Sequence, residues 1–70
     1  MHFSRHAKNR ARELGVSIGD AEAVIANPLE IDIREPGKIR YIGYVQGERV
    51  RVVVPIDDPN LIVTIHRRFR

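Results

Sequence analysis

Apolar residues near the start of the chain follow the three-to-four residue spacing of an α-helix. They fall on one narrow stripe: Phe3, Ala7, Ala11 and Leu14. Ser4 is placed to cap this helix, and Gly15 can adopt the left-handed conformation that helix ends favour. The pattern therefore predicts a helix over residues 5–14 with one buried side.

A second, shorter helix is predicted directly afterwards. Ser17 and Asp20, three positions apart, have the spacing of a capping box. The apolar positions that follow are Ala21, Val24 and Ile25. The Asn-Pro pair at residues 27–28 ends the helix. Both helices are short, so each needs a sheet to cover.

From residue 29 onward the apolar spacing changes to strict alternation, which is typical of β-strands. Turn signals at residues 36–37, 46–47 and 57–60 divide this part of the chain. Four strands are predicted, over residues 29–34, 39–45, 49–56 and 61–68.

The lengths of these turns predict the strand register, because a slip of one residue would move every apolar side chain to the wrong face. The expected pairs are Tyr41 with Val52, Gly43 with Val50, Val63 with Val54, Ile65 with Val52, and Ile33 with Tyr41. All four strands then share one apolar face. The predicted fold class is α+β: two N-terminal helices packed on one face of a four-stranded antiparallel meander sheet, forming a single domain over residues 1–70.

The same register predicts an unusually basic opposite face. Its three expected rows are Glu30, Tyr44, Arg49 and Arg68; Asp32, Ile42, Arg51 and His66; and Arg34, Arg40, Val53 and Thr64. One interpretation is a solvated sheet face with weak cross-strand ion pairs. The other is a phosphate-binding surface, because arginine forks hold phosphates and a tyrosine ring can stack on a base.

Composition limits the function classes further. Seventy residues amount to one small domain, and a chain this short gains stability from a dimer or a tight partner. Twelve basic and nine acidic residues give a net charge of +3, and ten of the bases are Arg, so a polyanion such as RNA is a candidate partner.

The candidate chemistry on the basic face is RNA cleavage without a metal. This reaction needs a group that takes the 2′-hydroxyl proton, a group that protonates the leaving oxygen, and cations over the phosphate. His66, Tyr44 and the pair Arg49 and Arg51 can supply these roles. The residues expected to bind nucleic acid are Arg40, Tyr44, Arg49 and Arg68.

A second candidate group lies on the first predicted helix. His6 and Arg10 are four residues apart, beside the apolar stripe. If the helix crosses the sheet near its rim, both side chains flank the basic face. The alternative is that His6 is a packed or capping side chain, and whether His6 or His66 matters more stays open.

Other classes are not favoured by the sequence. The chain has no Cys, three scattered His and no His-x-x-x-His pattern, so we expect no metal site and no cofactor. No apolar run approaches the roughly 18 residues of a membrane span, and the first residues lack the apolar core of a signal peptide. We therefore expect a cytoplasmic protein with no membrane partner.

Several short motifs resemble those of a known family. They are Ser4-Arg5-His6-Ala7-x-x-Arg10, Gly15-Val16-Ser17, Asn27-Pro28, Tyr41-x-Gly43, Arg51-Val52-Val53-Val54 and Val63-Thr64-Ile65. Together they look like a family of small bacterial domains of unknown function that is grouped with RelE/ParE-type toxins and with the barnase, EndoU, colicin and RelE nuclease fold.

The resemblance implies a metal-independent ribonuclease that a cognate antitoxin protein neutralises. Carried over by motif, the site positions are His6, Arg10, Arg51 and Thr64. Two departures concern catalysis: Leu14 stands where family members often carry a base, and His66 with the basic tail stands where RelE-like enzymes place a Tyr or Lys.

Two functions follow from these observations. The first is a metal-independent endoribonuclease of toxin-antitoxin type, with His6, Arg10, Arg51, Thr64 and His66 as its catalytic residues. The alternative is a non-catalytic module on a degenerate toxin fold that binds a protein or a nucleic acid, since one fold hosts many functions.

Overall fold

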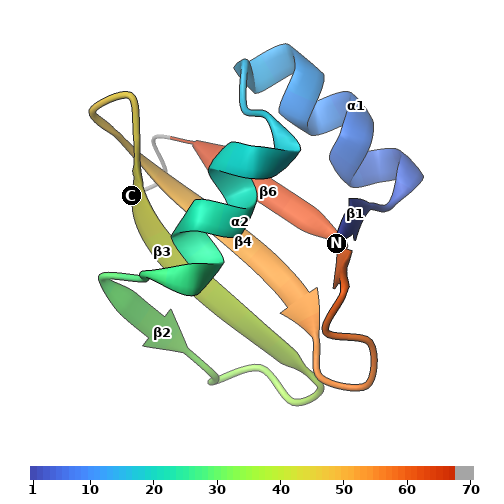
Figure 1. The fold of residues 1–70 in the computed structure, drawn as a ribbon. Helices are drawn as coiled ribbons and strands as arrows, with labels where there is room; N and C mark the ends of the chain where they lie inside the picture. Colours follow the sequence, from blue (N-terminus) through green and yellow to red (C-terminus); the bar gives the residue numbers. More distant parts are fainter. Residues whose placement is uncertain (68–70) are drawn as a thin grey trace.

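A computed structural model describes residues 1–67 of the chain. Two helices and a four-stranded sheet form the body of the molecule (Figure 1). Helix α1 (Arg5–Leu14) begins at Ser4, whose side chain accepts the Ala7 N–H, and ends at Gly15 with φ 71°. Helix α2 (Ile18–Ala26) begins at the capping box of Ser17 and Asp20. Both helices lie where the sequence predicts them, because their caps are local signals.

The strands form two sheets rather than one. The larger is antiparallel with the order β2 (Glu30–Asp32), β3 (Lys38–Val45), β4 (Glu48–Pro55) and β6 (Thr64–Arg67). The smaller joins β1 (His2–Phe3) to β5 (Leu61–Ile62) in parallel.

The predicted fold class is therefore wrong in its element order. A strand precedes the helices, strands lie at both ends of the described chain, and the last predicted strand is divided into β5 and β6. A parallel pair between the first and the last parts of the chain leaves no trace in local spacing, because it depends on residues about sixty positions apart. The helices are inserted between strands instead of preceding all of them.

The division of the last strand occurs at Val63. The Val63 N–H donates to the Val53 carbonyl at 3.0 Å while Thr64 pairs with Val53, so two residues lie opposite one, as in a β-bulge. Side-chain alternation is interrupted there, and Ile62 and Ile65 are both fully buried. The prediction that Val63 packs in the core is wrong, since Ile62 takes that place.

Ser4 connects this bulge to the first helix. Its hydroxyl donates to the Val63 carbonyl at 3.3 Å, accepts the Ala7 N–H at 3.1 Å, and its backbone N–H donates to Ile62 at 2.8 Å. The residue that caps α1 therefore also holds the start of the chain against β5.

The central register matches the prediction. Tyr41 lies opposite Val52, Gly43 opposite Val50, and Ile65 opposite Val52. The β3–β4 turn at Gln46 and Gly47 has positive φ at both residues, as the tight two-residue hairpin requires.

The register of the first strand of the large sheet is wrong in the prediction. Ile31, not Ile33, lies opposite Tyr41, because the chain leaves the sheet after Asp32. The Asp32 carboxylate accepts the Arg34 N–H at 3.0 Å, which forms a side-chain turn at this point. An even slip keeps each side chain on its expected face and changes only its neighbours. Asp32 now lies opposite Arg40, and Glu30 opposite Ile42.

Both helices cover the same face of the large sheet, α1 mainly over β6 and α2 over β3 and β4 (Figure 1). The buried cluster on that face joins helix and strand residues: Ala7, Ala11, Val16, Ala21, Val24, Val45, Val50, Val52, Val54, Ile62 and Ile65. Gly43 allows α2 to approach closely, since a Cβ there would lie 3.3 Å from Val24 Cγ1. The opposite face carries no helix of the described residues and holds the site.

Candidate functional site

A small hollow lies on the open face of the sheet. Its lining comes from the β2–β3 loop and from β3, β4 and β6: Glu35, Lys38, Arg40, Arg51, Val53, Thr64 and His66. The hollow measures about 170 Å³, below the roughly 300–1,000 Å³ of drug-sized ligand sites. It brings together Arg40, Arg51, Thr64 and His66, four residues that the sequence singles out, and has room for one small group such as a phosphate.

Strand pairing explains why these four side chains meet. Arg51 lies opposite His66, and Thr64 lies opposite Val53, whose other neighbour across the sheet is Arg40. Val53 is only 5% exposed although no helix covers it, so the surrounding polar side chains shield it. On the open face, polar side chains therefore pack around the apolar side chain of Val53 and exclude water from it.

Arg40 is held by two carboxylates. Its guanidinium donates to Glu35 at 2.7 Å, and Asp32 lies 3.9 Å away. Lys38 also pairs with Glu35, at 3.5 Å. Glu35 thus lies between two cations, in the position that an anionic ligand would take.

Asp32 has a partner outside the hollow as well. Arg34 donates to it through Nε and Nη2 and through its backbone N–H. These hydrogen bonds lower the pKa of Asp32 to about 2. Asp32 is therefore an ionised acceptor at neutral pH.

His66 has a lowered pKa. The first cause is burial, and the second is the positive charge of Arg51; Arg10, Arg40 and His6 lower it further. Burial also lowers the pKa of Arg51, with a smaller effect from Arg40. His66 is therefore a neutral imidazole at pH 7, able to accept a proton, beside fixed cations.

Helix α1 brings further charges to the same place. It packs on β6, the edge strand of the sheet, and His6 and Arg10 lie on exposed positions of this helix. Both lower the pKa of His66 through their charge, so each lies within electrostatic range of that imidazole. Arg10 also lies 4.0 Å from Glu13 one turn later.

The remaining predicted binding residues lie apart from the hollow. Tyr44, 60% exposed, lies opposite Arg49 at the far end of the β3–β4 hairpin. Arg49 donates to Glu30 at 3.1 Å. Arg68, expected in the same row, lies outside the described residues. Tyr44 is therefore not part of the hollow around His66.

Comparison with known protein families adds one finding. The family model described as Domain of unknown function (DUF4258) matches residues 3–67. The chain belongs to this family. The comparisons with curated proteins and with solved structures found no match. The match covers both helices and every residue that lines the hollow of this DUF4258 domain.

Sequence reasoning missed Glu35 and Lys38, which it assigned to a turn. The signal that could have found them is the acid and the base on either side of the Pro-Gly pair, since a tight turn brings such residues together. Both residues line the hollow, and Glu35 forms ion pairs with Lys38 and with Arg40.

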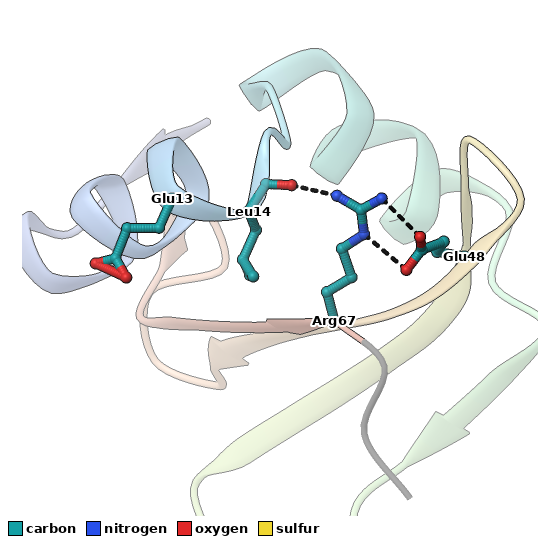
Figure 2. A pocket seen from close by; sticks show the side chains of 4 residues that line it. All are labelled: Glu13, Leu14, Glu48 and Arg67. Atoms are coloured by element: carbon teal, nitrogen blue, oxygen red, sulfur yellow. Dashed lines mark hydrogen bonds and ion pairs between the residues drawn. The ribbon is translucent and has the colours of Figure 1, made fainter.

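Arg67 was also missed, and it has a structural position on the helix-covered side of the domain. Figure 2 shows its guanidinium between β4 and the end of α1, where it donates to both Glu48 oxygens at 3.0 Å and to the Leu14 carbonyl. It neutralises the free carbonyl end of the helix. In the sequence, Arg67 is one of several Arg residues in a basic tail, and nothing in the local pattern marks it as different from the others.

Two further findings concern ligand and membrane classes. Among residues 1–67, no three His, Asp or Glu side chains gather in the way a metal site requires. No described helix has both the length and the apolar character needed to cross a lipid bilayer.

Proposed function

We propose that this DUF4258 domain is a metal-independent endoribonuclease of toxin-antitoxin type that acts on RNA. The observation that carries the proposal is the hollow on the open face, where neutral His66 lies with Lys38, Arg40 and Arg51. An RNA phosphate fits this set because it is a small anion that arginine forks bind in two-pronged fashion.

In the proposed reaction, the imidazole of His66 takes the proton of the 2′-hydroxyl. The 2′-oxygen then attacks the adjacent phosphorus and forms a pentavalent phosphate. Arg51 and Arg40 stabilise its added negative charge, and the Thr64 hydroxyl donates to a non-bridging oxygen. A lowered pKa suits a base that must be unprotonated at neutral pH.

The leaving 5′-oxygen needs a proton as its bond to phosphorus breaks. His6 donates it from α1, and Arg10 holds the flanking phosphate. The products are a 2′,3′-cyclic phosphate and a free 5′-hydroxyl. Tyr44 and Arg49 bind the neighbouring nucleotide by stacking and by charge.

Binding of the phosphate requires Arg40 to exchange Glu35 for the ligand. The 2.7 Å contact is an ion pair between partly exposed groups, so its net contribution is small and the exchange costs little. We therefore expect Glu35→Gln to raise the affinity for RNA, while Glu22→Gln, on the exposed side of α2, serves as the matched control.

The test is incubation of the purified protein with a mixed RNA pool, with and without a chelator. Cleavage that persists in chelator and leaves 2′,3′-cyclic ends supports the proposal. Absence of cleavage at micromolar protein contradicts it. For the toxin role, growth arrest on expression, relieved by a small protein from the neighbouring gene, is the expected result.

The second candidate is a module of the same fold that binds nucleic acid or protein without cleaving it. It is favoured by the acidic partners Asp32 and Glu35, which already neutralise Arg40. A surface that binds a protein can keep such pairs, whereas binding of a phosphate requires the cation to be released. If the module binds RNA, it shares the RNA contacts of the first candidate, and cleavage distinguishes the two.

If the domain binds single-stranded RNA, with or without cleaving it, the affinity should fall steeply with salt. Each neutralised phosphate contributes about −0.7 to the slope of log affinity against log salt. Replacing Arg49 and Arg51 by Ala should therefore reduce the slope by about 1.4. An unchanged slope would place the RNA on the exposed bases of α1 instead.

A further inference from the structure

An exposed row of basic side chains follows one side of helix α1. Arg5, Lys8, Arg10 and Arg12 are all exposed, and the one acidic residue of this helix is Glu13, which lies 4.0 Å from Arg10. Among residues 1–67, no carboxylate forms an ion pair with the other three bases. Arg5, Lys8 and Arg12 therefore remain available to an external anion.

The basic residues of the large sheet differ in this respect. Carboxylates already pair with Arg40, Arg49 and Arg67, at 2.7, 3.1 and 3.0 Å. A polyanion that binds the sheet must compete with these acids, whereas one that binds α1 meets cations that no acid neutralises. Because unneutralised charge directs the approach of a charged ligand, a polyanion is attracted first to α1.

The three unpaired bases form one line on the surface. They are three and four residues apart, the spacing that places side chains one above the other on a helix. Ala7 and Ala11 are buried, so the row is turned away from the core. It extends about 10 Å along the helix axis. Figure 1 shows α1 at one side of the molecule, where a long ligand can pass along it.

The chemistry of this surface fits the backbone of a nucleic acid better than a protein or a membrane. Every exposed residue of α1 is charged or polar. The centre of a protein interface is normally apolar, and a helix that lies on a membrane inserts an apolar side. The apolar side of α1 is already buried against the sheet. A phosphate backbone requires only cations and hydrogen-bond donors, which this surface supplies.

We infer that the row of Arg5, Lys8 and Arg12 binds the backbone of single-stranded RNA on one side of the phosphate that the hollow holds. The position of that phosphate rests on the proposed function. Arg10, on the same helix, lies within electrostatic range of His66, so one strand can reach both places. At about 3.4 Å or more per nucleotide, twelve nucleotides extend about 40 Å, which exceeds the 28 Å length of the domain.

The test uses a single-stranded deoxythymidine dodecamer, which has no 2′-hydroxyl and so stays intact during the measurement. The variant combines Arg5→Gln, Lys8→Gln and Arg12→Gln, since glutamine is a good helix former at exposed positions. Its affinity at low salt should fall about tenfold or more, and the slope of log affinity against log salt by about 2. The double variant Arg5→Lys and Arg12→Lys keeps the charge and should keep both values.

A matched pair separates the row from net charge. Lys8→Gln and Ala23→Glu each lower the net charge by one, and both positions are exposed, but Ala23 lies on α2. We expect Lys8→Gln to reduce the salt slope by about 0.7 and Ala23→Glu to leave it unchanged. Thermal unfolding checks that each variant is folded.

Three results would overturn the inference: a wild-type protein that does not bind the dodecamer, a triple glutamine variant that binds it with unchanged slope, or equal losses for Lys8→Gln and Ala23→Glu. Poly-L-glutamate that binds the row as tightly as the dodecamer would also overturn it, in favour of an acidic protein. The probe cannot be cleaved, so failure here leaves the proposed ribonuclease reaction to its own test.

Discussion

The two edges of the large sheet are built in opposite ways. At the β6 edge, α1 packs on the strand, the chain start pairs with β5, and Arg67 joins the end of α1 to β4. At the β2 edge, three aliphatic side chains stay exposed and the strand has three residues. Packing between distant segments is therefore concentrated at the β6 edge, while the β2 edge leaves aliphatic side chains exposed.

The largest expected effect concerns the chemistry at the β6 edge. His66→Ala should lower the rate of RNA cleavage by about 10²–10⁴-fold, because the base for the 2′-hydroxyl is lost. The matched variant His2→Ala, at an exposed histidine, should leave the rate unchanged. The measurement is single-turnover cleavage of a labelled RNA.

His6→Ala separates the two histidines. If His6 donates the leaving-group proton, the rate falls while the melting temperature stays nearly unchanged, since the side chain is exposed. A destabilised but active His6→Ala protein beside an inactive, stable His66→Ala protein would limit the site to the sheet.

The next effect compares a fully buried aliphatic residue near the β6 edge with an exposed one at the β2 edge. Ile62→Ala should lower the free energy of unfolding by about 2–5 kcal/mol, because Ile62 is fully buried and the loss leaves a cavity. Ile31→Ala should change it by less than about 0.5 kcal/mol in dilute, monomeric protein. Urea unfolding at low protein concentration measures both, and equal losses would contradict the contrast.

Arg67 gives a smaller effect. Arg67→Ala should cost about 1–3 kcal/mol of unfolding free energy, since it removes charge-assisted hydrogen bonds to Glu48 and to the Leu14 carbonyl. Arg34→Ala, at an arginine 86% exposed in its side chain, should cost far less. Thermal unfolding measures both variants. If the two lose similar unfolding free energy, the contacts of Arg67 with Glu48 and Leu14 in Figure 2 stabilise the domain no more than an exposed ion pair does.

The smallest effect is a pH dependence. His66 has a lowered pKa in the folded protein, from burial and from Arg51, Arg10, Arg40 and His6, so the unfolded chain binds its proton first. Stability should therefore fall as the pH drops below about 6.5, the ordinary value for histidine, and be unaffected above it. His66→Gln should flatten the unfolding free energy between pH 7 and the folded pKa; an unchanged slope would contradict this origin.

Much of the candidate site was accessible from the sequence. Alternation and the Gln46-Gly47 turn place Arg40 and Arg51 on one face, and the pairing of β4 with β6 adds Thr64 and His66. The slip of β2 by two residues did not disturb this, because faces repeat every two positions. The slip changed only which residues lie opposite one another, so Asp32 rather than Arg34 lies opposite Arg40.

Local signals in the sequence were enough to predict the features that depend on neighbours along the chain. These are the caps at Ser4 and Ser17, the stop at Gly15, the tight β3–β4 turn and the two faces of the central hairpin. Each follows from contacts between residues a few positions apart, where the backbone offers few alternatives.

The features that depend on distant segments were set by tertiary packing. The start of the chain pairs with β5, the last strand is interrupted at Val63, and Ile62 rather than Val63 lies in the core. The position of α1 over β6 brought His6 and Arg10 within electrostatic range of His66, while α2 packs on β3 and β4. Such choices are made by packing between elements far apart in sequence, for which local spacing carries no signal.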